Sequence, residues 1–232
     1  MKKIFWDKGH GGSDPGAVAN GLQEKVLTHK IVEYGMDYLQ ANYTGFEQRV
    51  SRAGDQTLTL SQRAKMANDW GADVFISTHI NAGKGTGFES YIYNGGVSSQ
   101  TVALQNVLHG EILAAMRQFG NVVDRGKKRA NYAVLRETKM PAVLTENLFI
   151  DSNDAKLLKN EEFLKAVGEA HARGIAKFLG LPQKAKTAPS QPQQKASAGK
   201  LYRVQVGAFS DRKNAERLAE ELKKKGYPAI IV

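Results

Sequence analysis

The chain has 232 residues, of which 33 are Lys or Arg, 23 are Asp or Glu and none is cysteine. This length predicts one full domain with room for a small second module, and a hydrophobic content of 41% excludes global disorder. The absence of cysteine excludes disulfides, thiolate zinc sites, iron–sulfur clusters and cysteine nucleophiles, and no apolar run approaches the ~18 residues of a membrane span.

Strands and helices alternate along the first 181 residues. Short runs rich in β-branched and aromatic residues predict strands, whereas apolar residues three or four positions apart predict helices. In chain order these patterns give a strand at 3–7, a helix at 25–42, a strand at 46–50, a helix after the N-cap Thr59, strands at 73–80 and 88–93, a helix at 98–119, a strand at 142–146 and a helix at 161–179. This alternation predicts an α/β fold with a single twisted, mostly parallel sheet flanked by helices.

The helical periodicity also predicts which residues face the core. Each predicted helix carries an apolar stripe with spacings of three or four residues. The stripes are Leu27, Ile31, Tyr34, Tyr38 and Leu39 in the first helix; Leu60, Ala64 and Ala67 in the second; Leu104, Leu108, Ile112, Ala115 and Phe119 in the third; and Phe163, Val167, Ala170, Gly174 and Phe178 in the fourth.

Residues 182–199 differ in composition from those before them. They include three Pro and many Gln, Ala, Ser and Lys, but no Val, Leu, Ile or aromatic residue, which predicts a flexible linker. Residues 200–232 then predict one β-α-β unit, with strands at 201–209 and 227–232 around a helix at 211–225. We expect such a short unit to bury little core on its own.

Positive charge is concentrated in this C-terminal part. Residues 182–232 contain 11 Lys and Arg against 4 Asp and Glu, which gives +7 of the net charge of +10. Such a tail is typical either of a solvated surface or of a segment that binds a polyanion, such as nucleic acid, an anionic membrane or an anionic wall polymer. No nucleic-acid-binding motif with interleaved aromatic residues is present, so we predict no nucleic-acid partner.

Four polar residues occur where open α/β sheets bind ligands, beyond the carboxyl ends of the strands. His10 follows the first strand in a Gly-rich loop, and Glu24 opens the helix that comes after this loop. His79 and Glu146 lie at the ends of two later strands. If these strands are adjacent, the four side chains converge on one edge of the sheet.

Two histidines and one glutamate form a ligand set that suits zinc and leaves a fourth position open for water. Zinc lowers the pKa of that water to ~7, and a further carboxylate is needed to carry its proton to a leaving amine. We therefore predict that His10, Glu24 and His79 bind the metal and that Glu146 acts as the base.

Each of these residues also has a plainer interpretation. A single histidine at a strand end is commonly a hydrogen-bonded structural residue, Glu24 could favour the positive end of a helix, and Glu146 could be an exposed loop acid. His29, His109 and His171 lie within predicted helices, and we interpret them as structural or surface residues.

Four segments with this order and spacing resemble the zinc-dependent N-acetylmuramoyl-L-alanine amidases of the type-3 amidase family. The segments are 3–16, the GLQEK of 21–25, the STHIN of 77–81 and the LTENLF of 144–149. The resemblance runs to about residue 181, and it is strongest to sporulation and mother-cell-lysis amidases and to phage endolysins. It implies a catalytic domain over 1–181.

The resemblance implies a role for each site residue. His10, Glu24 and His79 match the family's ligands for one zinc ion, and Glu146 matches its catalytic glutamate. Asn81 matches a frequent asparagine after the second histidine, with a role in contacting substrate or supporting a ligand. Lys8 replaces the proline usual before the Gly-His-Gly-Gly motif. We expect a looser turn with an intact metal site, and a cation beside the zinc that either disfavours metal or attracts an anionic substrate.

The implied reaction is hydrolysis of the amide between N-acetylmuramic acid and L-alanine in peptidoglycan, a cell-wall-degrading, autolysin-type activity that releases stem peptides. Residues 200–232 resemble half of a SPOR peptidoglycan-binding module. We therefore expect the protein to act at the cell wall outside the cell. We expect peptidoglycan as its partner, with anionic wall polymers as further contacts of the basic tail, and we expect a monomer. The apolar run 4–6 is too short for a signal peptide, so we expect either release by mother-cell or host lysis or a signal that this sequence does not include.

Two other functions stay open at this point. A zinc carboxypeptidase or another small-amide hydrolase could use the same ligands, with Arg52 or Arg63 anchoring a terminal carboxylate. A wall-binding protein without catalysis is the second alternative, although all four expected site positions are filled.

Overall fold

The computed structural model describes residues 1–185 and 212–226. The chain divides into two compact units, Met1–Ala185 and Lys186–Val232. In the second unit the structure describes helix α7 (Arg212–Lys224), close to the predicted 211–225. The predicted strands 201–209 and 227–232 and most of the linker 182–199 lie outside the described residues.

The first unit is built around a six-stranded sheet with the strand order β4-β1-β5-β8-β6-β7. Neighbouring strands are parallel except for β6 and β8, which are antiparallel. A separate two-stranded hairpin is formed by β2 and β3. The strands are β1 (Lys2–Lys8), β2 (Val18–Ala19), β3 (Leu22–Gln23), β4 (Phe46–Val50), β5 (Val74–Asn81), β6 (Phe88–Tyr93), β7 (Asp124–Ala130) and β8 (Ala142–Phe149). The predicted α/β fold with a mostly parallel sheet is therefore confirmed.

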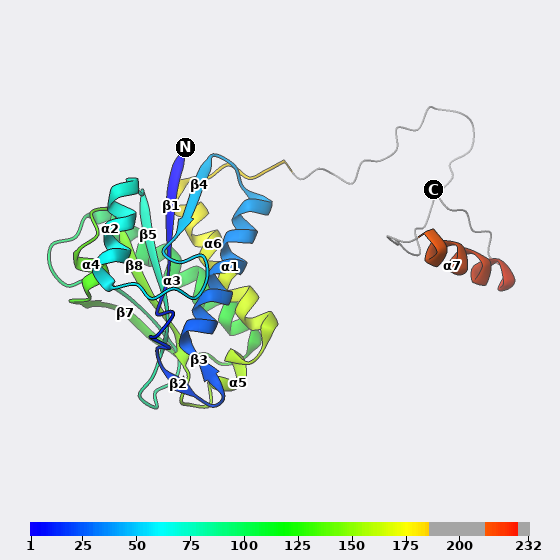
Figure 1. Cartoon of the computed structure of the whole chain (residues 1–232), viewed down its shortest axis with the longest axis horizontal. Helices are drawn as coiled ribbons and strands as arrows, with labels where there is room; N and C mark the ends of the chain where they lie inside the picture. Colours follow the sequence, from blue (N-terminus) through cyan, green and yellow to red (C-terminus); the bar gives the residue numbers. More distant parts are fainter. Residues whose placement is uncertain (186–211, 227–232) are drawn as a thin grey trace. The chain divides into compact units, whose positions relative to one another are not determined.

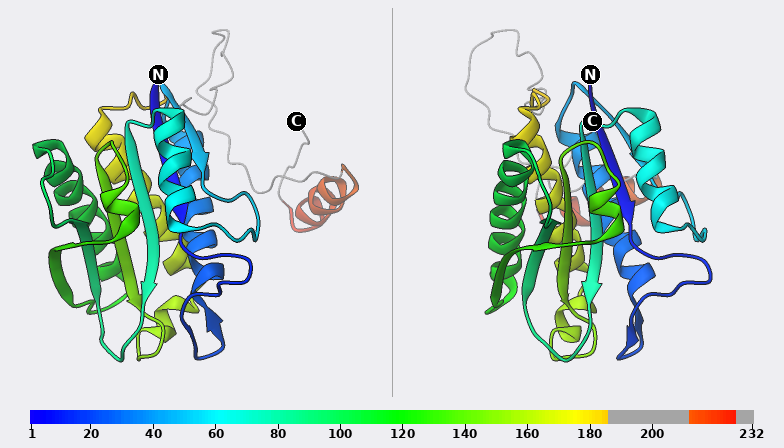
Figure 2. Two further views of the ribbon diagram at one scale, coloured as in Figure 1. Left: turned by 60° about the vertical axis from the view of Figure 1, so that its left-hand side comes forward. Right: turned by 90° about the vertical axis from the view of Figure 1, so that its left-hand side faces the viewer.

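Helices cover both faces of this sheet. Those of the first unit are α1 (Glu24–Asn42), α2 (Leu60–Trp70), α3 (Ser99–Met116) with a 3-10 turn at Arg117–Phe119, α4 (Ala133–Arg136), α5 (Ala155–Leu158) and α6 (Glu161–Leu179). The long helices α1, α3 and α6 pack on one face, and the short helices α2 and α4 on the other (Figures 1 and 2). No described helix has the length and apolar character that crossing a membrane requires.

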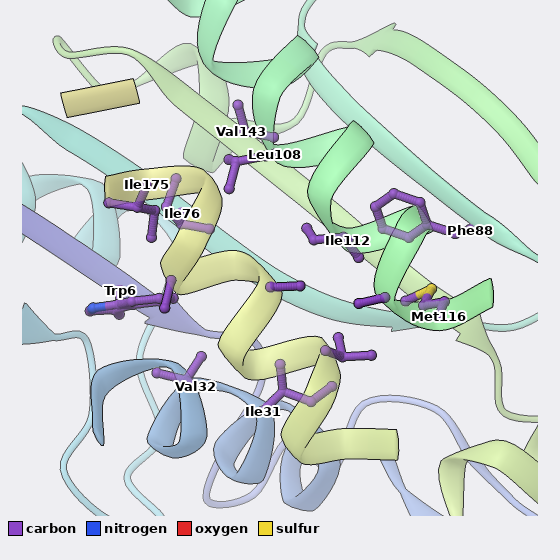
Figure 3. Packing of buried hydrophobic residues seen from close by; sticks show 14 of the residues in the cluster. Trp6, Ile31, Val32, Ile76, Phe88, Leu108, Ile112, Met116, Val143 and Ile175 are labelled. Carbon is purple, nitrogen blue, oxygen red and sulfur yellow. The ribbon is translucent and has the colours of Figure 1, made fainter. Parts of the chain in front are cut away.

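The larger core fills the space between the sheet and the three long helices. Figure 3 shows side chains from the sheet interleaved with those of the helices, namely Trp6, Ile76, Phe88 and Val143 against Ile31, Val32, Leu108, Ile112, Met116 and Ile175. The predicted apolar stripes of α1, α3 and α6 contribute to this core, with Tyr34, Tyr38, Phe119 and Phe178 only partly buried. A smaller core lies under α2 and α4.

Thr59 caps α2 as predicted, since its hydroxyl accepts from the Gln62 N–H and the Gln62 side chain accepts from the Thr59 N–H. One predicted core position in α2 is wrong, because Leu60 is exposed. Arg63 is buried in the same helix, because its guanidinium forms an ion pair with the buried Asp7 of β1.

The C-terminal half of the sheet departs from the prediction in two ways. Strand β8 continues to Phe149, so Glu146 lies inside the strand and not at its end. Strand β7 was not predicted, because its sequence DRGKKRA has no apolar run. It pairs with β6 as an edge strand, where charged side chains are usual since they discourage pairing with other chains.

His171 is fully buried between α6 and the sheet, as a structural histidine should be. Its Nδ1–H donates to the Val167 carbonyl oxygen (2.8 Å), so Nε2 accepts from the Thr145 hydroxyl (3.0 Å). Burial lowers the pKa of His171 to about 4, which keeps the imidazole neutral in the folded protein.

We predict that this histidine makes the fold sensitive to acid. Between pH 6.5 and about 4 the unfolded chain binds a proton at His171 that the folded chain does not. The free energy of unfolding should therefore rise with pH across this window, by about 3 kcal/mol from this residue, and be unaffected by it above pH 6.5. Denaturant unfolding of the full chain, measured in chelator at several pH values, tests this expectation.

A His171→Gln variant provides the control, because carboxylates that titrate near pH 4 contribute equally to both proteins. The variant should be less stable at neutral pH but should lose less stability on acidification. Equal slopes for the two proteins between pH 4 and 6.5 would contradict the assignment.

Candidate active site

Three of the predicted site residues meet at one point. The ligand atoms of His10, Glu24 and His79 all lie within 4.8 Å of one another. Oε1 of Glu24 is 3.1 Å from Nε2 of His10 and 3.0 Å from Nδ1 of His79. Within residues 1–185 and 212–226, this is the one group of at least three His, Cys, Asp or Glu side chains whose donor atoms converge in this way.

The loop after β1 places His10. His10 adopts a left-handed backbone conformation (φ 60°), which is uncommon for a residue with a side chain. Arg63 holds it there by donating to its carbonyl oxygen (2.8 Å). The preceding residue must be glycine, since a Cβ on Gly9 would lie 2.5 Å from Cε1 of His79. The loop therefore brings the two histidines together by close backbone approach.

Glu24 is the first residue of α1 and is only 4% exposed. Its Oε2 accepts from the Ala17 N–H (2.9 Å), and its Oε1 accepts from the Ile80 N–H (3.0 Å). Burial by itself raises the pKa of Glu24, but the hydrogen bonds from His10 and His79 outweigh it and hold the pKa below the usual range. Glu24 is thus a fixed carboxylate and not merely a charge at a helix terminus.

His79 lies on β5 with its side chain 14% exposed. Burial lowers its pKa, but the hydrogen bond to Glu24 and the charge of Glu24 outweigh burial and raise the pKa to about 9. The Glu24 contacts likewise raise the pKa of His10 against the effect of burial. Without a metal, the carboxylate of Glu24 therefore favours the protonated form of both imidazoles. This indicates a site with a strong preference for positive charge.

The cluster fits a tetrahedral zinc ion. Ligand atoms at ~2.0–2.1 Å from zinc lie about 3.3 Å apart, close to the two distances from Glu24. Asp14 adds a supporting contact, because its Oδ2 accepts from Nδ1–H of His10 at 2.8 Å. This bond fixes the tautomer that leaves Nε2 free to bind a metal, as carboxylates do for many metal-binding histidines. Asp14 had no signal in the sequence, since its contact depends on the path of the loop.

Glu146 lies beside this cluster. In the parallel pairing of β5 and β8, His79 stands directly opposite Glu146. Oε2 of Glu146 is buried and has no hydrogen-bond partner among the described residues. Burial raises the pKa of Glu146 to about 7; the charge of His79 opposes this shift, whereas those of Glu24 and Glu89 add to it. The structure thus brings all four predicted residues together, with Glu146 as a carboxyl group that exchanges protons near neutral pH.

Arg52 and Arg63 do not line an anchor for a terminal carboxylate. Each residue is 3% exposed. Each guanidinium donates to backbone carbonyl oxygens in and around the loop that carries His10. Arg63 contacts the carbonyl oxygens of Lys8 and His10, while Arg52 contacts those of Lys8, Gly9, Gly54 and Lys25. Both arginines therefore hold the loop in shape, and the exopeptidase alternative loses its proposed anchor.

Lys8 also differs from expectation. Its charge does not lie beside the group formed by His10, Glu24 and His79, because its fully buried side chain forms an ion pair with Glu33 of α1. Alternation along β1 explains this placement: Lys8 points to the same face as Trp6, toward α1, while Asp7 points to the face that carries His79. The expected effects of Lys8 on metal or substrate therefore have no structural basis.

Asn81 reaches Glu89, a residue that the sequence did not single out. The Asn81 side-chain amide donates to Oε1 of Glu89 at 2.7 Å. Glu89 is 3% exposed and stands directly opposite Glu146 in the antiparallel pairing of β6 and β8. Alternation along β6 could have suggested an inward-facing acid at this position, but only the pairing shows that Glu89 neighbours Glu146.

Comparisons with known proteins identify the family to which the chain belongs. The N-acetylmuramoyl-L-alanine amidase family matches residues 4–177, and the SPOR domain family matches residues 180–232. The N-acetylmuramoyl-L-alanine amidase CwlM of Bacillus licheniformis and the sporulation-specific N-acetylmuramoyl-L-alanine amidase of Bacillus subtilis are each 45% identical over the whole chain, which covers 85% of either relative. The endolysin of Bacillus phage SPP1 is 45% identical over 89% of this chain and 77% of its own length.

Solved structures show the same fold. The catalytic domain of the amidase CwlV from Bacillus (Paenibacillus) polymyxa is 32% identical, with a TM-score of 0.72 over 78% of this chain and 99% of that domain. An N-acetylmuramoyl-L-alanine amidase from Clostridium difficile 630 is 30% identical, also with a TM-score of 0.72, over 77% of this chain and 97% of that protein. Residues 180–232 are thus similar to the SPOR domain family, and the chain as a whole belongs to the N-acetylmuramoyl-L-alanine amidase family of enzymes.

Proposed function

We propose that this protein is a zinc-dependent hydrolase that cleaves the amide bond between N-acetylmuramic acid and L-alanine in peptidoglycan. His10, Glu24 and His79 hold one zinc ion, and Glu146 carries the proton. The observation that supports this proposal best is the pairing of the ligand cluster with an unpartnered, buried carboxylate oxygen on the neighbouring strand. The names of the relatives supply the substrate, which the geometry alone does not identify.

When bound, zinc polarises a carbonyl group and lowers the pKa of water to about 7. The residues of the chain supply the rest. Glu24 provides the negative charge that balances the cation, and Asp14 orients His10. Glu146 takes a proton at its free oxygen and delivers it to the nitrogen of the leaving L-alanine, a transfer that is most efficient when the pKa of the carrier lies near neutrality.

We propose that this activity is directed to the cell wall. The SPOR domain match at residues 180–232 supports binding to peptidoglycan, and the +7 charge of residues 182–232 favours anionic wall polymers as additional contacts. The division of the chain into units at 1–185 and 186–232 suits a catalytic domain carried separately from a wall-binding segment.

Product analysis tests the proposed reaction. The zinc-loaded full chain is incubated with purified peptidoglycan, and the soluble products are identified by mass spectrometry. We expect intact stem peptides with a free N-terminal L-alanine and uncut glycan strands. Release of single amino acids would indicate an exopeptidase, and release of glycan fragments would indicate a glycosidase; either result contradicts the proposal.

A further inference from the structure

We propose that Arg125 and Lys128 of β7 form a binding site for a carboxylate of the stem peptide, next to the position where the amide is cleaved. The proposal rests on the proposed function and deepens it. It assigns a specificity-determining role to two residues outside the metal cluster.

The sheet places both cations near Glu146, on the face that carries the site. Glu89 of β6 stands opposite Glu146, and the pairing of β6 with β7 sets Tyr91 opposite Lys128, two residues further along the same face of β6. Strand β7 is two strands from β8, or about 10 Å. Both cations cover part of this distance, since Arg125 Nε donates to Oε2 of Glu89 on the intervening strand β6 (2.8 Å) and Lys128 forms an ion pair with the same atom.

Glu89 is a rigid anchor for these cations. The other oxygen of its carboxylate, Oε1, accepts from the Asn81 amide (2.7 Å) and the Tyr91 hydroxyl (2.9 Å). Burial raises the pKa of Glu89, but the bonds from Lys128, Arg125 and Tyr91 outweigh it and keep the pKa below its usual range. A buried carboxylate with four donors thus fixes the position of two cations, although one cation would balance its charge.

The second positive charge is available to a ligand. Arg125 uses Nε for Glu89, whereas no described residue accepts a hydrogen bond from its two terminal nitrogens. Its guanidinium lies over the ring of Phe149 (4.8 Å), and the side chains of Arg125 and Lys128 are 34% and 37% exposed. A guanidinium held by Nε and by an aromatic ring presents its terminal N–H groups in a fixed orientation, which suits a carboxylate.

Charge complementarity indicates that this cationic site binds the peptide part of the substrate and not the glycan part. The sugar rings of the glycan strand are neutral, whereas the stem peptide carries carboxylates. One extended residue spans about 3.3–3.6 Å, so a carboxylate on the second residue of the stem lies about 7 Å from the cleaved bond. From Glu146 this length reaches past Glu89 on the neighbouring strand, where the two cations from β7 make their contacts.

The test compares two synthetic muramoyl peptides with the zinc-loaded full chain. In one, the second residue carries a free α-carboxylate, and in the other this group is a carboxamide. We expect the wild type to prefer the acid by about ten- to 100-fold in kcat/KM, mainly through KM. Arg125→Gln should abolish most of this preference and Lys128→Gln part of it, because each substitution lowers kcat/KM more for the acid than for the carboxamide.

Arg129→Gln is the matched control, because it removes the same charge from the same strand at a position opposite Ile92, on the other face of the sheet. It should leave the preference intact. If Arg125→Gln lowers kcat/KM equally for both substrates, or if the wild type shows no preference, the carboxylate site is wrong while the proposed reaction stands. If the wild type cleaves neither substrate but still cleaves peptidoglycan at another bond, the proposed function itself fails.

Discussion

Replacing Glu146 by glutamine is expected to reduce kcat on peptidoglycan by about 10²–10⁴-fold, because the amide can neither take nor deliver a proton. The substitution keeps the size of the side chain and removes only the group that titrates near neutral pH. Since Glu146 is not among the three side chains whose donor atoms converge, the variant should still bind one zinc ion per chain. Release of stem peptides and zinc content, measured on the same samples, give both quantities.

A matched control is Glu111→Gln on α3. Glu111 pairs with Lys177 of α6, and both helices cover the face of the sheet opposite to the side chain of Glu146, so this variant should retain full activity. Undiminished hydrolysis by the Glu146→Gln protein would show that another group carries the proton. Loss of zinc from that protein would instead place Glu146 among the ligands.

Replacing His79 by alanine should abolish both metal binding and hydrolysis. Two ligands and an open cavity cannot complete the tetrahedral site, so we expect zinc affinity to fall by more than about 100-fold, since even the loss of a residue that only supports a ligand costs 10- to 100-fold. Hydrolysis should fall to the background rate at the zinc concentrations at which the wild type is fully active. Metal content after gel filtration and the clearing of purified cell walls measure the two effects.

His29→Gln on α1 is the corresponding control, because His29 is a half-buried histidine outside the converging cluster. It should hold zinc like the wild type. Near-ultraviolet circular dichroism of both variants in chelator shows whether the fold persists. A folded His79→Ala protein with an unchanged zinc affinity, or a wild type that clears walls equally well after its metal is stripped, would overturn the ligand assignment.

Local patterns predicted the elements that have apolar faces. Strands β1, β4, β5 and β6 and helices α1, α2, α3 and α6 occur where hydrophobic periodicity or caps indicated them. The elements that the pattern missed are those without such a face. Strand β7 is held by pairing with β6 and by polar side-chain contacts, and the four-residue helices α4 and α5 are too short to show a period.

The site could be predicted because its residues sit beside recognisable local features. His10 follows a strand and precedes glycines, Glu24 begins a helix and His79 lies on the clearest strand. By contrast, we expected Lys8 beside the metal-binding candidates, although alternation along β1 turns its side chain toward α1. Arg52 and Arg63 were open to a substrate role because the sequence does not show that they are buried.

The sequence by itself determined the class of fold and indicated three candidate metal ligands and a candidate base, because strand ends, glycines and side-chain chemistry are local properties. Only the tertiary structure decided which groups meet. Pairing across β5, β8 and β6 brings His79, Glu146 and Glu89 into one row, and it leaves Oε2 of Glu146 buried without a partner. Strand order and burial arise from contacts between residues far apart in the chain, and no local pattern encodes them.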